Sequence, residues 1–261
     1  MGKKIVTLVL CSLMVLSCTV SAFADSTGPS GDSMVNSAVT IEQQEADVLN
    51  DSSLSAAKKI LFKKKFETHR LFLAKDLARN LNKLDSLVTI NATTNPSGTI
   101  AVPYYKQENS YYCGPATTRQ TVSFIKGSAS SQSVIASAIG TTTAGSDLTP
   151  MKNYLNSVQS RNAYVITTSP SESYIQFIAE YGVTESAPPM ARLKIVKGGN
   201  WLYPSAGHFM NVSGYKSYGS SIRVTDPYIG WVVAGHVGSY YVTSAELYTA
   251  TATHFAHQMS Y

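Results

Sequence analysis

The sequence predicts an α+β protein, with helices early in its folded region and a mainly antiparallel sheet later. Helix-like segments fill residues 113–181, whereas short segments of alternating polarity dominate after residue 190. Elements segregated along the chain in this way are typical of α+β folds. The 261 residues are 44% hydrophobic and 14% charged, a composition unlike that of membrane-embedded, disordered or collagenous chains.

The first 24 residues have the pattern of a signal peptide. Lys3 and Lys4 precede an apolar run over residues 5–16, which is short for a membrane span, and Ala-Phe-Ala at 22–24 offers a cleavage site. We therefore expect an exported bacterial protein that is secreted or held at the cell surface. A membrane anchor and lipidation at Cys18 are the two alternatives.

Residues 25–96 are expected to form a flexible leader and then a basic amphipathic helix. The leader is rich in Ser, Gly and Asp, and a helical pattern follows over residues 41–87. Residues 54–96 carry a net charge of about +6, so the basic excess of the chain belongs to this segment. The apolar side chains of its pattern are Ile60, Leu61, Phe66, Leu71, Leu73, Leu77 and Leu81.

Three roles for the basic helix remain open. It could contact a membrane or cell-wall surface, pack on the domain that follows, or cover an active site as a propeptide. We favour packing, and we expect no nucleic-acid partner. The turn-rich stretch at 91–98 marks a boundary. The expected organisation is a signal peptide at 1–24, a pro-segment or spacer at 25–96, and a folded domain at 97–261.

Within the folded domain the elements follow in a clear order. Helices are expected at 113–124, 131–139, 151–158 and 171–181, and strands at 190–196, 208–215, 222–225 and 240–243. The first helix should begin at Cys113, because proline is favoured in a first helical turn and Pro115 stands two residues later.

Cys113 is the residue with the strongest chemical signal. The other two cysteines lie in the targeting segment, so the folded region holds one unpaired thiol, which indicates reactivity more than a disulfide. The start of a helix stabilises an anion, and the thiolate is the nucleophilic form of cysteine. Gly114 beside it is expected to let another chain approach the sulfur.

His208 and Asp226 are the expected partners of this thiol. His208 opens one predicted strand and Asp226 ends the next, nine residues either side of a turn centred near Ser217. The first residue of one hairpin strand lies opposite the last of the other, so the carboxylate could orient the imidazole. A bulge could shift this register by one residue.

Four short segments resemble the papain-like peptidases related to bacteriocin-leader (double-glycine) processing domains. They are residues 102–107 (VPYYKQ), 112–116 (YCGPA), 207–209 (GHF) and 224–228 (VTDPY), and the likeness covers roughly residues 99–250. It implies a papain-like fold with Cys113 as nucleophile, His208 as base and then acid, and Asp226 as orienter. It also implies that Gln107 supplies an oxyanion-hole amide.

The resemblance has a limit. Leader-processing enzymes are usually fused to a membrane exporter and face the cytoplasm, so cleavage after double glycine does not carry over to this chain. The leading interpretation is an exported cysteine peptidase that hydrolyses a peptide or protein through an acyl-thioester. The alternatives are a cell-wall peptide amidase with the same triad, and a non-catalytic binding protein on the same scaffold. No metal-ligand cluster or phosphate-binding loop is visible, so we expect no cofactor.

Overall fold

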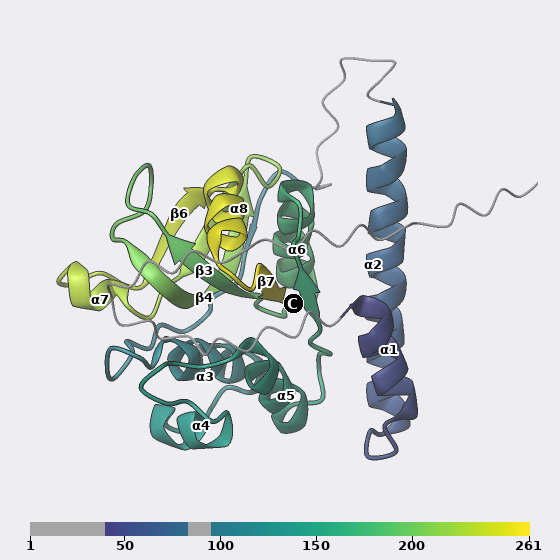
Figure 1. Ribbon diagram of the computed structural model, residues 1–261, viewed down its shortest axis with the longest axis horizontal. Helices are drawn as coiled ribbons and strands as arrows, with labels where there is room; N and C mark the ends of the chain where they lie inside the picture. Colours follow the sequence, from purple (N-terminus) through teal and green to yellow (C-terminus); the bar gives the residue numbers. More distant parts are fainter. Residues whose placement is uncertain (1–39, 83–94) are drawn as a thin grey trace, which may run out of the picture.

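The computed structural model describes residues 40–82 and 95–261, and it consists of a central sheet with helices on both faces and a helical arm at one side (Figure 1). The predicted signal peptide, the leader before Thr40 and the first half of the boundary at 91–98 lie outside the described residues. Among the described helices, none combines the length and apolar composition that crossing a bilayer requires.

The sheet of the described chain has seven strands, and every pair is antiparallel. The four strands expected after residue 190 are confirmed, whereas the sequence analysis did not anticipate three very short ones. The order across the sheet is β2 (Ile166–Thr168), β7 (Gln258–Ser260), β3 (Met190–Ile195), β4 (Ser205–Lys216), β5 (Ser221–Thr225) and β6 (Ser239–Thr243), with β1 (Gly98–Thr99) paired to β4.

The two faces of β4 bury side chains in two separate cores. Phe209 packs in the core beneath the early helices, while its neighbour Met210 packs in the core on the other face. The early helices are α3 (Cys113–Lys126), α4 (Gln132–Ala138) and α5 (Leu148–Val158), and the opposite face carries α6 (Glu172–Thr184) and α8 (Ser244–Thr253). The α+β prediction, with helices first, is confirmed.

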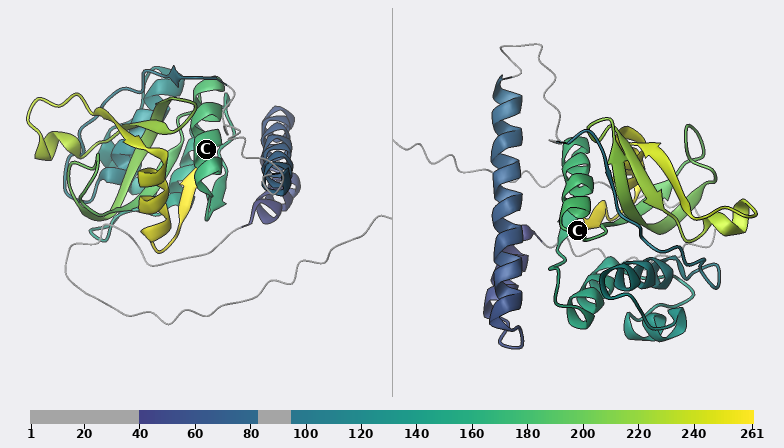
Figure 2. Two further views of the ribbon diagram at one scale, coloured as in Figure 1. Left: turned by 90° about the horizontal axis from the view of Figure 1, so that it is seen from above. Right: turned by 180° about the vertical axis from the view of Figure 1, so that it is seen from behind.

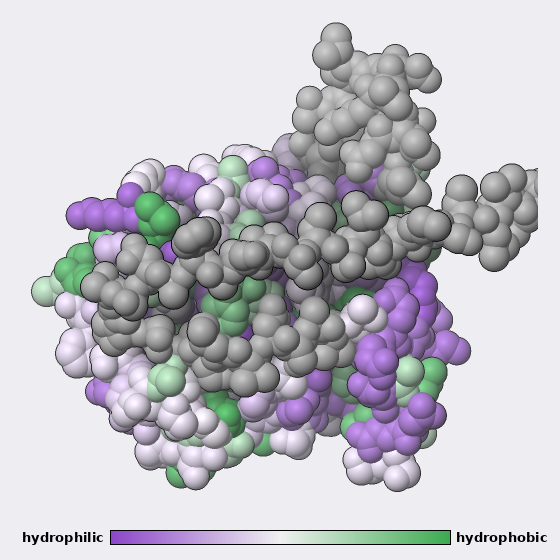
Figure 3. All heavy atoms as spheres, in the orientation of Figure 1, coloured by the Kyte–Doolittle hydropathy of each residue, from purple (hydrophilic) through white to green (hydrophobic). Residues whose placement is uncertain are grey.

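The helical arm consists of α1 (Ile41–Asn50) and α2 (Ala56–Asn82), and its buried face differs from the expected one. Ile60, Leu71 and Leu73 of the expected apolar stripe are exposed. The side chains of α2 that are buried recur instead at spacings of one, three and four residues: Lys58, Phe62, Lys65, Phe66, His69 and Phe72. Figure 3 shows the mostly hydrophilic outer surface of the arm.

Polar side chains of α2 are buried because the surface they meet is itself polar and aromatic. Lys58 Nζ donates hydrogen bonds to the carbonyl oxygens of Gln159 (2.9 Å) and Asn162 (2.5 Å). Lys65 Nζ lies 4.7–5.4 Å from the ring centroids of three tyrosines, Tyr164, Tyr181 and Tyr261. In Figures 1 and 2 the arm stands beside α6 and the C-terminus, on the far side of the molecule from α7 (Ile229–Val232).

Candidate active site

The thiol of Cys113 lies at the first residue of α3, as the proline in the first turn predicted. Cys113 is a free cysteine and is buried. Tyr112 precedes it as the N-cap without a side-chain capping bond. The backbone N–H groups of the first turn therefore remain available to a negative charge near the sulfur.

Gly114 has a packing role that the sequence did not predict. A Cβ atom at this position would lie 2.3 Å from Ser146 Oγ and 2.6 Å from Ser146 Cβ. Ser146 exchanges a hydrogen bond of 2.8 Å with Thr141, within the segment that leads into α5. Gly114 thus permits the close approach of this segment to α3, and the expectation that it clears a path to the sulfur stays a prediction.

His208 and Asp226 meet through a hydrogen bond of 2.8 Å from His208 Nε2 to Asp226 Oδ1. They come from neighbouring strands, but they are not directly opposite each other. Asn211 pairs with Thr225, and extending that register sets Asp226 across from Met210, two residues from His208. The pair is therefore diagonal on one face of the sheet, a separation that long side chains can span.

The predicted register is wrong because the turn is longer and the hairpin is bulged. Lys216 pairs with Ser221, so four residues form the turn, and Ser217, Tyr218 and Gly219 all have positive φ. A register shift between Val212 and Gly214 adds one residue to β4. The net displacement is two residues, which preserves the face of the sheet on which each side chain lies.

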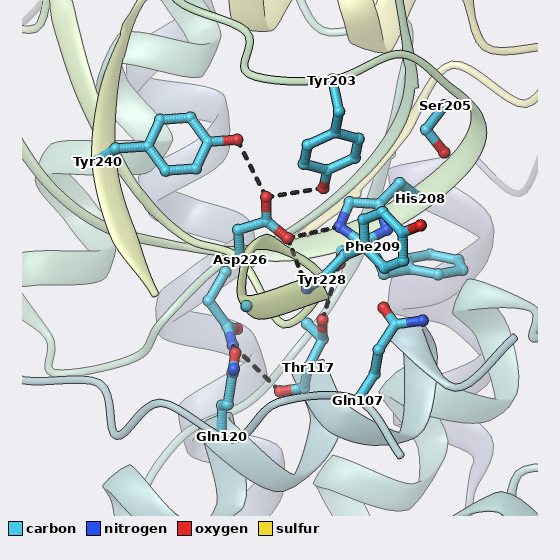
Figure 4. Close-up of polar contacts among 12 residues, drawn as sticks. Gln107, Thr117, Gln120, Tyr203, Ser205, His208, Phe209, Asp226, Tyr228 and Tyr240 are labelled. Carbon is cyan, nitrogen blue, oxygen red and sulfur yellow. Dashed lines mark hydrogen bonds and ion pairs between the residues drawn. The ribbon is translucent and has the colours of Figure 1, made fainter. Parts of the chain in front are cut away.

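Asp226 is completely buried and accepts four hydrogen bonds (Figure 4). Besides His208, the backbone N–H of Tyr228 donates to Oδ1 (2.9 Å). The hydroxyl groups of Tyr203 (2.7 Å) and Tyr240 (3.0 Å) both donate to Oδ2. Sequence analysis did not identify these two tyrosines, since nothing in their local sequence marks them as partners of a residue on another strand.

The charges of this pair follow from its contacts. Burial by itself lowers the pKa of His208, but Asp226 and then Cys113 counter it and together raise the pKa to about 10. Burial opposes ionisation of Asp226, yet His208 and Tyr203 outweigh it and lower the pKa of Asp226 below its usual value. At neutral pH the site therefore holds an imidazolium beside a carboxylate. Because Nε2 bonds Asp226, Nδ1 is the nitrogen left for the sulfur.

Gln107 lies at the same site and is almost fully buried. Figure 4 shows its side chain pointing towards His208 and Phe209. Its Nε2 donates one hydrogen bond to the Asn109 carbonyl (2.7 Å), and its backbone N–H donates to the Pro227 carbonyl (2.9 Å). The second hydrogen of the amide is free to point at a negative oxygen near Cys113.

The other polar candidates are engaged elsewhere. Asn211 bonds the helix through Thr121 and Gln120, so it does not compete with Asp226 for His208. His69 contacts Tyr174 and Tyr261 on the arm side, and His236 accepts from the Gly238 N–H. No group of three or more metal-ligating side chains occurs within residues 40–82 and 95–261.

A family model described as "Peptidase_C39 like family" matches residues 99–247 of the chain, which span all four site residues. The search of proteins of curated function found no match to this chain. Among solved structures, it is similar to a double-glycine motif protease from an AMS/PCAT transporter in complex with the leader peptide. That likeness has 15% identity and a TM-score of 0.43, and covers 66% of this chain and 96% of the other.

Two further likenesses have the same low level of identity. The peptidase domain of Streptococcus ComA, a bifunctional ABC transporter, shares 12% identity with a TM-score of 0.42, over 62% of this chain and 97% of its own. Digestive procathepsin L 3 from the Tenebrio molitor larval midgut shares 11% identity with a TM-score of 0.43, over 85% and 98%.

Proposed function

The chain belongs to the Peptidase_C39-like family of cysteine peptidases, and from that premise we propose that Cys113, His208, Asp226 and Gln107 form its catalytic machinery. Membership confirms the family resemblance of the four sequence segments and the papain-like fold. The observation that carries the proposal is that the buried imidazole of His208 is hydrogen-bonded to the Asp226 carboxylate, while both Asp226 and Cys113 raise its pKa.

The proposed reaction proceeds in two steps. The Cys113 thiolate attacks the carbonyl carbon of a peptide bond, and the His208 imidazolium gives its proton to the leaving amine nitrogen as the C–N bond breaks. The products are a free amine and an acyl-thioester. Neutral His208 then takes a proton from water, whose hydroxide attacks the thioester, and this releases the carboxylic acid and restores the thiolate–imidazolium pair.

Each partner has one task in this scheme. Asp226 holds the imidazole through Nε2 and stabilises its positive charge, while its three other hydrogen bonds fix the carboxylate itself. The amide of Gln107 and the Cys113 backbone N–H would stabilise the oxyanion of each tetrahedral intermediate. One such donor typically contributes about 3 kcal/mol to the transition state.

We also propose that the enzyme acts outside the cytoplasm, on the strength of the N-terminal basic and apolar pattern of residues 1–24. The segment at 25–96 would then be a spacer whose helices pack on the enzyme. The buried contacts of Lys58 and Phe66 with the following domain favour this role over a surface-binding one.

The test uses protein that begins at Asp25, in which Cys113 is the single cysteine. We expect a fluorescent iodoacetamide to label it, and the same protein to cleave members of a quenched-fluorescence peptide library. Cys113→Ala should abolish both signals, and Cys113→Ser should abolish labelling. Cleavage that persists in Cys113→Ala would refute the proposal, whereas cleavage confined to cell-wall peptide amides would favour the amidase.

A further inference from the structure

We propose that Trp231 is a positioning residue for the oxyanion site, because its indole N–H holds the backbone carbonyl of Gln107. The inference rests on the proposed function, in which the Gln107 amide stabilises the oxyanion. Trp231 Nε1 donates a hydrogen bond of 3.0 Å to the Gln107 carbonyl oxygen, across 124 residues of sequence. No sequence motif points to this contact.

The contact belongs to a set that joins the Gln107 segment to the loop between β5 and β6. The Gln107 N–H donates to the Pro227 carbonyl at 2.9 Å, so both backbone polar groups of Gln107 are bound by this one loop. The Gly230 N–H also donates to Tyr104 Oη at 3.2 Å. Tyr104 packs so closely that a Cβ atom at Gly238 would lie 2.1 Å from its ring.

The loop that makes these contacts is itself tied to the catalytic carboxylate. Its first residue is Asp226, whose N–H donates to the Gly238 carbonyl at 2.7 Å and closes the base of the loop. The Tyr228 N–H donates to Asp226 Oδ1 inside it. One hydrogen-bonded loop therefore carries the group that orients His208 and the group that holds Gln107.

The orientation of the Gln107 amide depends on these backbone contacts. Its side chain makes one described hydrogen bond, to the Asn109 carbonyl, and Gln107 Oε1 has no partner among the described residues although it is buried. Since one hydrogen bond holds the Gln107 amide, the direction in which the amide points depends on where the backbone places the Gln107 Cα atom. Releasing the carbonyl from Trp231 should thus let the free N–H of the amide move away from the oxyanion.

Core packing does not account for the place of Trp231. The side chain is 51% exposed, and its loop neighbours Val232, Val233 and Val237 are exposed as well. The ring instead lies under Lys106 Nζ, 4.3 Å from the ring centroid, beside the residue it holds. The polar contact is the feature that distinguishes this indole from an ordinary surface tryptophan.

Two reagents separate the oxyanion from the nucleophile. Acylation of Cys113 by p-nitrophenyl acetate passes through an oxyanion, whereas alkylation by iodoacetamide is a direct displacement that reports the thiolate and His208. Trp231→Phe keeps a ring for Lys106 and removes the N–H donor. We expect acylation to fall about tenfold with alkylation unchanged, against a loss of ~10²-fold or more in acylation for Gln107→Ala.

The double variant and a loop control complete the test. In the Gln107→Ala background, Trp231→Phe should have no further effect, because the group it positions is gone. Val237→Ala, an exposed residue of the same loop, should match the wild type in both reactions. Three results would overturn the inference alone: acylation of Trp231→Phe at the wild-type rate, a loss of alkylation in Trp231→Phe as large as its loss of acylation, or additive losses in the double variant. If the wild-type protein were acylated no faster than Cys113→Ala, the proposed function would be overturned as well.

Discussion

Replacing Asp226 by asparagine should separate the charge of this residue from its shape. The amide is close to isosteric with the carboxylate, so its oxygen can still accept from His208 and Tyr228. Tyr203 and Tyr240 can rotate their hydroxyl groups to accept from the amide nitrogen. The hydrogen-bonding geometry survives in this variant, and the negative charge does not.

The magnitude follows from the protonation of His208. Raising its pKa from 6.5 to about 10 corresponds to a preference of about 5 kcal/mol for the imidazolium. Asp226 makes the largest contribution to that rise. In its absence, Cys113 alone would counter the lowering of the pKa of His208 by burial. Most of the His208 imidazolium should therefore lose its proton at pH 7. We expect peptide hydrolysis to fall ~10²-fold or more.

The assay measures iodoacetamide alkylation and peptide hydrolysis between pH 5 and 9 in Asp226→Asn and the wild type. Asp47→Asn, an exposed substitution on the helical arm, is the matched control and should change neither. Asp226→Ala would be a poorer probe, because it strands four donors at ~1–3 kcal/mol each and should unfold more readily. Alkylation and hydrolysis in Asp226→Asn at wild-type rates across the pH range would refute this account of the site.

The same substitution should change how stability depends on pH. The pKa of His208 is higher in the folded than in the unfolded protein, so its contribution is complete below about pH 6.5 and is lost as the pH rises towards 10. The pKa of Asp226 is lowered on folding, so its contribution is present above its ordinary value near 4 and is lost in more acidic solution. Urea unfolding of Asp226→Asn should show weaker losses at both ends.

Two further predictions concern packing. Lys65→Met should increase the free energy of unfolding by ~1–2 kcal/mol in urea, because burial lowers the pKa of Lys65 and its ammonium has no hydrogen-bond partner in the described structure. A loss of stability would mean that the three tyrosine rings hold a charged lysine. Gly114→Ala should lower Tm through a clash with Ser146 worth ~1–3 kcal/mol, and the second change Ser146→Gly should restore most of it. Equal Tm values for Gly114→Ala with and without Ser146→Gly would contradict the clash.

The sequence by itself determined the order of the elements and the place of Cys113 at the start of a helix. A helix that begins at Cys113 follows from Pro115, since proline fits the first turn without losing a helical bond. The alternation along β4 and β5 also determined that His208 and Asp226 share a face of the sheet. Local rules suffice for such features because neighbouring residues decide them.

The tertiary structure alone decided the register of the hairpin, the buried face of α2 and the contact of Trp231 with Gln107. A bulge and a four-residue turn made the His208–Asp226 pair diagonal. Lys58 and Lys65 of α2 are buried against a surface of aromatic rings and carbonyl groups, whereas the apolar periodicity had selected Leu71, which is exposed. Each outcome depends on a partner far away in sequence. The free energy that selects each arrangement comes from the contact between two surfaces, so the sequence of either segment by itself does not predict it.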